Sequence, residues 1–307
     1  MFAFSTCWNS HRHIDGRAML DEVRALGFEY AELGHGTRLS LLDGIQRAVA
    51  AKEIKIASVH NFCPLPLGVM NSAPDYYLPS SRDEHERELA VRHTLRSIEC
   101  AASLGARAVV LHLGIVAMRN YTGRLLELFA DGGAEAPKFQ RVLGKALAVR
   151  TKKRQRHLDQ VYRTLEAVLP TARERKVILG LETRFGVEEI PDELEAAEIL
   201  QRFGQDGLAY WHDVGHAQVK ENLGLTSHET LLGRFQGRTA GMHLQDFAPP
   251  AHDHQPPGFG TFDFSRLARF VTDDMVMAWE IHPEWTAEQV ADSCKRAQEL
   301  LRPPVPT

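Results

Sequence analysis

The chain has 307 residues, of which 44% are hydrophobic and 25% charged, with 36 Lys and Arg against 40 Asp and Glu. These values are near the averages for soluble globular proteins, and they exclude a disordered chain, a collagen-like chain and a disulfide-framework protein. The formal net charge of −4 argues against a nucleic-acid footprint that covers the whole surface.

The sequence shows neither an export signal nor a membrane span. No stretch approaches the roughly 18 consecutive apolar residues that a membrane helix needs, and the apolar segment 1–8 runs directly into polar residues. The four cysteines are Cys7, Cys63, Cys100 and Cys294. They are too few and too scattered for a disulfide scaffold or a zinc ribbon, so we expect a cytoplasmic protein in a reducing compartment. Cys63 is interpreted as a packed thiol rather than a nucleophile.

Short runs rich in Val, Ile and Leu alternate along the chain with longer amphipathic runs, a pattern typical of a parallel sheet with crossover helices. The short runs predict eight strands, at 2–8, 28–33, 54–60, 106–112, 177–182, 208–213, 239–244 and 276–281. The longer runs predict helices at 16–26, 39–51, 83–104, 157–175, 192–203, 227–235, 264–270 and 287–301. Eight successive strand–helix units favour an α/β fold, namely a closed (β/α)8 barrel, over an open doubly wound sheet.

An extended segment between the fourth and fifth strands is longer than one crossover helix requires. It covers about residues 113–157, and its second part, 138–157, carries eight Lys and Arg and no acid. One interpretation is a solvated helix on a crossover insertion. The other is a basic flap that meets a phosphate or another anionic substrate.

Residues able to bind a metal or transfer a proton fall at or just after most of the predicted strand ends. In chain order they are His60, His112, Glu182, Asp213, His216, His243 and Glu280, and a loop after the seventh strand adds His252 and His254. Because the carboxyl ends of barrel strands converge on one mouth, we expect these side chains to become neighbours. Residues two positions earlier share their face of the strand and are expected to point into the barrel.

The core set of Glu182, Asp213, His243 and Glu280 predicts a metal site. A cluster of carboxylates and imidazoles at one barrel mouth is costly without a cation, and this mixed oxygen and nitrogen set suits Zn²⁺, Mn²⁺ or Fe²⁺. The remaining histidines could be additional metal ligands, substrate ligands or hydrogen-bonded structural residues; they are His60, His112, His216, His252 and His254. Trp8 is either an apolar wall for the substrate or ordinary barrel packing.

This series of strand-end residues resembles the xylose-isomerase-like TIM barrel superfamily, which includes sugar isomerases and epimerases, inosose dehydratases and endonuclease IV. The resemblance covers most of the chain and implies a single barrel domain over residues 1–307, with the insertion as its least typical part. It also implies a divalent metal (Mn, Zn, Fe, Co or Mg) held by Glu182, Asp213, His243 and Glu280. The segment HDHQPPGFGTFDF, which contains His254, is similar to one common in the superfamily.

The resemblance implies proton transfer on a small sugar or keto-sugar through a metal-stabilised enediolate, with Glu182 and Glu280 as acid and base and His216 as a substrate ligand. Three alternatives stay open: a dehydratase or lyase acting through the same enediolate, a multinuclear zinc phosphodiesterase, and a metal-dependent sugar-binding protein. His60, His112, His216 and His254 match the endonuclease IV pattern, but His252 stands where that family has Asp. A homo-oligomer is expected from the superfamily alone, and nucleic acid is disfavoured as a partner.

Overall fold

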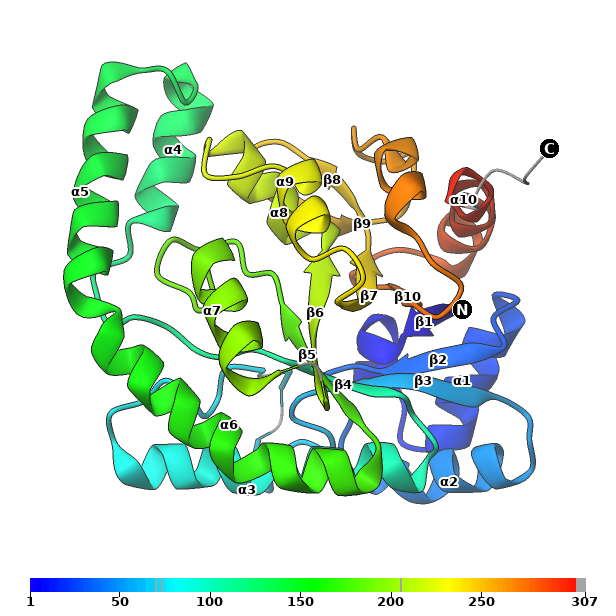
Figure 1. Ribbon diagram of the computed structural model, residues 1–307. Coiled ribbons are helices and arrows are strands. Elements are labelled where there is room, and N and C mark those ends of the chain that lie inside the picture. Colours follow the sequence, from blue (N-terminus) through cyan, green and yellow to red (C-terminus); the bar gives the residue numbers. More distant parts are fainter. Residues whose placement is uncertain (70, 73, 205, 302–307) are drawn as a thin grey trace.

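Eight parallel strands close into a barrel in the computed structural model, which describes residues 1–69, 71–72, 74–204 and 206–301 (Figure 1). The barrel strands are β1 (Phe2–Ser5), β2 (Tyr30–Leu33), β3 (Lys55–His60), β4 (Ala108–Leu111), β5 (Ile178–Glu182), β6 (Leu208–Asp213), β7 (Thr239–Leu244) and β10 (Val276–Trp279). They follow one another around the barrel in chain order, and β10 pairs with β1 to close it. The predicted α/β barrel is therefore confirmed.

Helices surround the barrel, and Figure 1 shows α3 and α6 lying along its lower side. The α-helices are α1 (Gly16–Ala25), α2 (Leu42–Ala50), α3 (Glu84–Ser103), α4 (Thr122–Gly132), α5 (Pro137–Lys153), α6 (Gln155–Arg175), α7 (Glu193–Phe203), α8 (Val214–Asn222), α9 (His228–Arg234) and α10 (Ala287–Leu300). Except in α4 and α5, their apolar faces pack on the outer face of the sheet because a helix stripe and a strand face must bury each other. No helix among the described residues is both long and apolar enough to span a membrane.

The barrel interior is filled by small residues around one large one, Trp211. A Cβ on Gly180 would lie 2.9 Å from the Trp211 ring, and one on Gly241 would lie 2.5 Å from it. Glycine at these two positions makes room for the indole, which meets the ring of His243 edge-on at 5.3 Å. The expected parity holds here, since each of these three residues stands two positions before a polar strand end. Trp211 thus fills the barrel interior directly beneath the polar side chains at the strand ends.

The structure corrects several predicted elements. The first strand ends at Ser5 rather than residue 8, and residues Thr6–Trp8 form a 3-10 turn because the Ser5 hydroxyl accepts the Cys7 N–H. The segment Phe264–Phe270 is a 3-10 helix, and the loop after β7 is an antiparallel hairpin of β8 (Asp246–Ala248) and β9 (His252–Gln255). Asp246 stabilises that hairpin by accepting N–H groups from the Pro/Gly loop that follows it.

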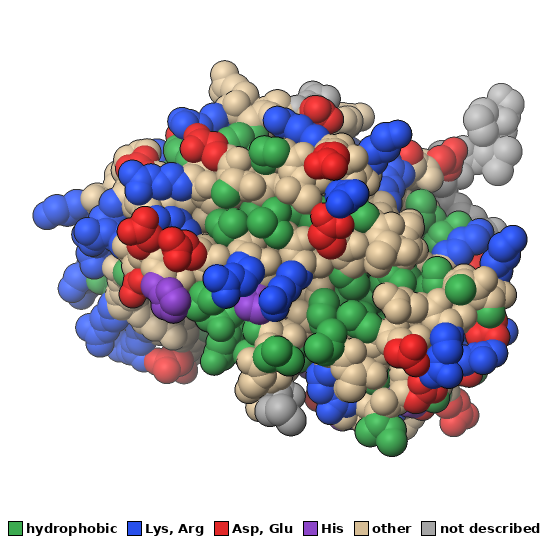
Figure 2. Space-filling view, turned by 90° about the horizontal axis from the view of Figure 1, so that it is seen from below, with side chains coloured by type: hydrophobic (Ala, Val, Ile, Leu, Met, Phe, Trp, Pro, Cys, Tyr) green, Lys and Arg blue, Asp and Glu red, His purple; other side chains and the backbone are tan. Residues whose placement is uncertain are grey.

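The insertion contains two helices, α4 and α5, which stand upright as a hairpin at the left of Figure 1. Leu125 and Phe139 form an apolar cluster between these helices that continues to Val219 of α8. Arg150 is buried, and its guanidinium pairs with Glu195 at 2.6 Å. Most of the other basic side chains of 138–157 are exposed, and in Figure 2 Lys and Arg are numerous along the left edge of the lower face, where α5 and α6 lie. This placement favours a solvated helix over a flap across the mouth.

Candidate metal centre

Four side chains from consecutive barrel strands converge at the carboxyl end of the barrel. Glu182 ends β5, Asp213 ends β6, His243 lies on β7, and Glu280 directly follows β10. Each has one ligand atom within 4.8 Å of those of the other three, and all four are at most 2% exposed. The structure therefore brings together the four residues that the sequence singled out as the core set.

His243 lies at the centre of this group. Its Nδ1 is 3.0 Å from Glu182 Oε1, 3.1 Å from Glu280 Oε2 and 3.5 Å from Asp213 Oδ2. Three carboxylates thus surround one ring nitrogen, each arriving from a different part of the barrel rim. A set of two Glu, one Asp and one His is a typical donor set for a divalent cation of the Mn²⁺, Fe²⁺ or Zn²⁺ type.

Asp213 and His216 belong to one local structure, since Asp213 caps the N-terminus of α8. Its Oδ1 accepts the His216 backbone N–H at 2.7 Å, and its Oδ2 accepts from Gln245 Nε2 at 2.8 Å. The segment from Asp213 to His216 is therefore a strand-to-helix junction, where β6 passes directly into α8. The His216 ring donates through Nδ1 to the Thr183 carbonyl at 2.9 Å, which leaves Nε2 as its free acceptor.

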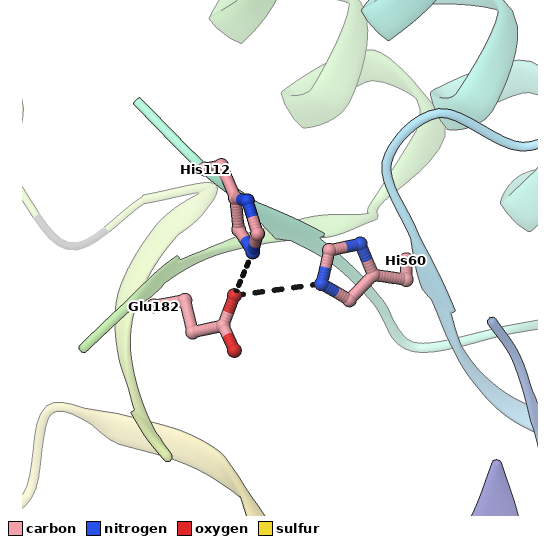
Figure 3. Close-up of side chains that lie close together, drawn as sticks. All are labelled: His60, His112 and Glu182. Atoms are coloured by element: carbon pink, nitrogen blue, oxygen red, sulfur yellow. Dashed lines mark ion pairs between the residues drawn. The ribbon is translucent and has the colours of Figure 1, made fainter. Parts of the chain in front are cut away.

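A second group shares Glu182 with the first and contains His60 and His112 (Figure 3). Glu182 Oε2 is 2.6 Å from His112 Nε2 and 3.4 Å from His60 Nε2. In Figure 3 both rings point toward the same carboxylate oxygen. Glu182 is therefore placed so that its two oxygens serve two adjacent groups.

Arg184 lies beside this second group, and the sequence analysis did not identify it. Its Nη1 is 2.5 Å from His112 Nε2 and 3.6 Å from Glu182 Oε2, and it is buried. Its other nitrogens pair with Glu189, and Asp75 holds the far nitrogen of His112 at 2.9 Å. The guanidinium of Arg184, which is always charged, thus lies close to two of the three side chains that could hold a second metal.

A third group consists of Asp253, His254 and His282. Asp253 Oδ1 is 3.1 Å from His254 Nδ1, and the rings of His254 and His282 stack at 4.6 Å. His252 is exposed and belongs to none of the three groups found among the described residues. Asp253, which precedes His254 on β9, is therefore the carboxylate beside that ring.

Glu32 and His35 also belong to this region and were missed. Glu32 is fully buried on β2, and its Oε2 is 3.1 Å from His243 Nε2. His35 follows β2, and its Nε2 is 3.7 Å from Glu280 Oε1. The signal that could have revealed Glu32 is a carboxylate inside the apolar run YAEL, on an inward-facing position.

Trp8 does not border this centre in the structure. Its ring packs edge-on against Phe4, its Nε1 donates to the Trp285 carbonyl at 2.8 Å, and Arg12 lies over its face. These contacts favour the packing interpretation. Cys7 rather than Trp8 lines the cavity of about 690 Å³ that opens beside Glu280, together with His35, Arg38, His254 and His282.

The ionisable side chains of the centre shift one another's pKa values. Burial alone would raise the pKa of Glu182 and of Glu280, but His112 and His243 respectively hold these pKa values well below the usual range. Burial alone would lower the pKa of His243, but Glu280 and Glu32 raise it well above its usual value. The pKa of His112 is raised to about 9, since Asp75 and Glu182 outweigh burial and the Arg184 charge.

A divalent cation fits these residues. Four carboxylates (Glu32, Glu182, Asp213 and Glu280) are buried around His243, the imidazole that lies within 3.5 Å of all four. Uncompensated buried carboxylates are expensive, whereas a cation between them offsets the cost. The donor chemistry and the charge balance both point to a metal at Glu182, Asp213, His243 and Glu280.

Comparison with known proteins places this geometry in a family. A model of the xylose isomerase-like TIM barrel matches residues 20–303. The chain belongs to the xylose isomerase-like TIM barrel family. No curated protein matches the sequence significantly.

Solved structures of the same fold cover nearly the whole chain at low sequence identity. A putative xylose isomerase from Rhodospirillum rubrum is 16% identical with a TM-score of 0.71, covering 99% of both chains. The 3-keto-D-glucoside 4-epimerase from E. coli is 13% identical with a TM-score of 0.68, covering 97% of this chain and 98% of that one. A D-tagatose 3-epimerase-like protein is 18% identical with a TM-score of 0.67, covering 98% and 97%.

Proposed function

We propose that this protein is a divalent-metal-dependent isomerase or epimerase of a small sugar or keto-sugar. The observation that carries the proposal is the convergence of three buried carboxylates on Nδ1 of His243. The sugar epimerases among the proteins of similar fold support the same chemistry. When bound by Glu182, Asp213, His243 and Glu280, a divalent cation would act as a Lewis acid and stabilise negative charge on the substrate oxygens.

Glu182 and Glu280 are the proposed acid–base pair. Both are held ionised by neighbouring imidazoles, and both approach the same point from different strands, β5 and the end of β10. One carboxylate removes the proton next to the substrate carbonyl, and the other, once it has taken up a proton from solvent, delivers that proton to the deprotonated substrate. Return to the same carbon from the opposite face gives an epimer, whereas return to the neighbouring carbon gives an isomer.

The substrate is proposed to lie in the cavity beside Glu280. Its volume of about 690 Å³ accommodates a monosaccharide, and its polar groups include Arg38, His35 and His254. The free Nε2 of His216 is proposed to orient a substrate oxygen. Loss of a leaving group after the same proton removal would make the enzyme a dehydratase or lyase, the nearest alternative reaction.

A second candidate function is metal-assisted phosphodiester hydrolysis at several zinc ions. The groups around His112 and around His254 favour it, since each offers three donors next to the core set. The guanidinium of Arg184 argues against it, because a fixed positive charge 2.5 Å from His112 Nε2 repels a second cation at that group. We therefore propose one catalytic metal.

Elemental analysis of protein purified without chelator tests this proposal first. One Mn, Zn, Fe, Co or Mg per chain is expected, and a panel of keto-sugars incubated in D₂O should then incorporate deuterium next to the carbonyl. Chelation should stop the exchange, and the same metal should restore it. Two or three zinc ions per chain would contradict the proposal and direct attention to phosphodiester substrates.

A further inference from the structure

A buried carboxylate, Glu32, lies directly behind the His243 ring on the side away from the other three carboxylates. Its Oε2 accepts a hydrogen bond from His243 Nε2 at 3.1 Å and another from Ser58 Oγ at 2.7 Å. Ser58 stands opposite Glu32 in the register between β2 and β3, so both side chains point into the barrel from neighbouring strands. Glu32 is 0% exposed, and the two hydrogen bonds fix its position.

The contact with Glu32 requires a hydrogen on Nε2 of His243. A carboxylate oxygen only accepts, so Nε2 must be the donor toward Glu32. Nδ1 faces the carboxylates of Glu182 and Glu280, so it also carries a hydrogen while no cation is bound. A cation among these carboxylates would replace the hydrogen on Nδ1, whereas the hydrogen on Nε2 stays directed at Glu32. An imidazole held in this tautomer presents a ready metal-binding nitrogen to the centre of the carboxylate group.

We propose that Glu32 is a positioning residue that orients His243 and fixes its tautomer, so that Nδ1 is the metal-binding atom. The inference rests on the metal-dependent function proposed above and assigns to that site a partner outside its four donors. A carboxylate bonded to the far nitrogen of a metal-binding histidine raises the basicity of the ligand and holds its ring in place.

Two competing roles for Glu32 fit the contacts less well. A structural ion pair is disfavoured because Glu32 pairs with no Lys or Arg among the described residues, and its Oε1 has no hydrogen-bond partner there. A direct metal ligand is disfavoured because Glu32 contacts Nε2, whereas the other carboxylates gather at Nδ1. The remaining role is to act through the imidazole.

The test compares Glu32→Gln with the wild type and with Glu29→Gln, the same chemical change on an exposed residue just before β2. Three quantities are measured: Mn²⁺ or Zn²⁺ affinity by chelator competition, thermal unfolding of the metal-free protein, and the visible absorption spectrum with Co²⁺. Glu32→Gln should weaken metal binding about 10- to 100-fold while the metal-free protein still unfolds cooperatively and the Co²⁺ spectrum keeps its wild-type band shape. Glu29→Gln should leave all three unchanged.

A second variant guards against misfolding of the first. Ser58→Ala removes one of the two hydrogen bonds that fix Glu32 and should weaken metal binding by less than tenfold, yet measurably. Wild-type affinity in both variants would overturn the inference and leave the proposed function intact. A Co²⁺ spectrum showing a lost ligand in Glu32→Gln would also overturn it, because Glu32 would then bind the metal itself. A wild-type protein that binds no divalent metal would overturn the proposed function and this inference together.

Discussion

Two buried histidines, His212 on β6 and His243 on β7, lie on neighbouring strands of this barrel, and the groups to which they belong differ in what surrounds them. His212 and His228 form the outer group, in which the two rings contact each other at 3.0 Å through Nε2 and Nδ1. The other nitrogen of His212 contacts the Tyr210 hydroxyl at 3.1 Å. Burial and the neighbouring His228 lower the pKa of His212 well below its usual value, and burial lowers that of His228 to about 4.

His243 is equally buried, but its pKa is shifted upward. Its neighbours are the carboxylates of Glu280 and Glu32, whose charges outweigh the effect of burial. His212 and Asp213 are adjacent on β6 and therefore face opposite sides of the sheet, one toward α9 and one toward the metal centre. The two sites thus share residue type and burial. They differ in whether carboxylates are present, which separates the neutral structural pair of His212 and His228 from the candidate metal centre at His243.

The largest expected effect comes from removing one charge of the proposed acid–base pair. Glu182→Gln and Glu280→Gln should each lower the rate of solvent-deuterium exchange by about 10²- to 10⁴-fold, because an amide neither removes nor returns a proton. Exposed Glu198→Gln, on the outer helix α7, is the matched control and should exchange at the wild-type rate. Normal exchange in either variant of the pair would contradict the assignment of the acid and base.

The next test exchanges one histidine from each group for the same residue. His243→Asn should lose metal affinity by more than 100-fold, since one of four donors is removed. His212→Asn should keep metal affinity within about twofold, but it should lower the free energy of unfolding by about 1–3 kcal/mol because Tyr210 and His228 lose a buried partner. Chelator competition and urea unfolding of both variants measure these quantities. Equal losses of metal affinity would erase the distinction between the two groups.

Much of the barrel and of its rim was predictable because both depend on strong periodic signals. Buried parallel strands are short apolar runs, and polar residues at their carboxyl ends must meet at one mouth. This argument predicts the convergence of Glu182, Asp213, His243 and Glu280, which the structure shows. The same argument left Trp8 open between an apolar wall and ordinary packing, and a 3-10 turn after Ser5 directs that ring into the packing around Phe4.

Glu32 and Arg184 were not predicted because their roles depend on neighbours that are distant in sequence. Glu32 is mid-strand, and only the contact with His243, 211 residues away, gives it a chemical role. Arg184 follows the Glu182 strand end, where sequence alone does not distinguish a solvated guanidinium from one directed at His112. Tertiary contacts rather than local pattern decide such cases.

The outer pair should make stability depend on pH. The pKa of His228 is about 4 in the folded protein, against an ordinary value of about 6.5 when unfolded, so acid protonates the unfolded chain first. The stability that the folded protein keeps by burying His228 in its neutral form is fully present above pH 6.5 and falls as the pH is lowered toward 4. By pH 5 the free energy of unfolding should be lower by about 2 kcal/mol. Urea unfolding at pH 7 and pH 5 should therefore show a smaller difference for His228→Gln than for the wild type. An unchanged difference would mean that other groups cause the acid destabilisation.

The smallest expected effect is at His252, which separates the single-metal proposal from the multinuclear one. Its side chain is exposed on β9, while His254 lines the cavity and contacts Asp253. His252→Ala should change the exchange rate by less than about twofold and the free energy of unfolding by less than about 0.5 kcal/mol, as for most exposed sites. The matched variant His254→Ala should change the exchange rate more, since His254 Nε2 is 3.6 Å from Glu280. If His252→Ala were as damaging as Glu280→Gln, the exposed imidazole would have to act as a ligand or base in the working enzyme. The hairpin would then have to rearrange during turnover, and one metal at Glu182, Asp213, His243 and Glu280 would no longer account for the reaction.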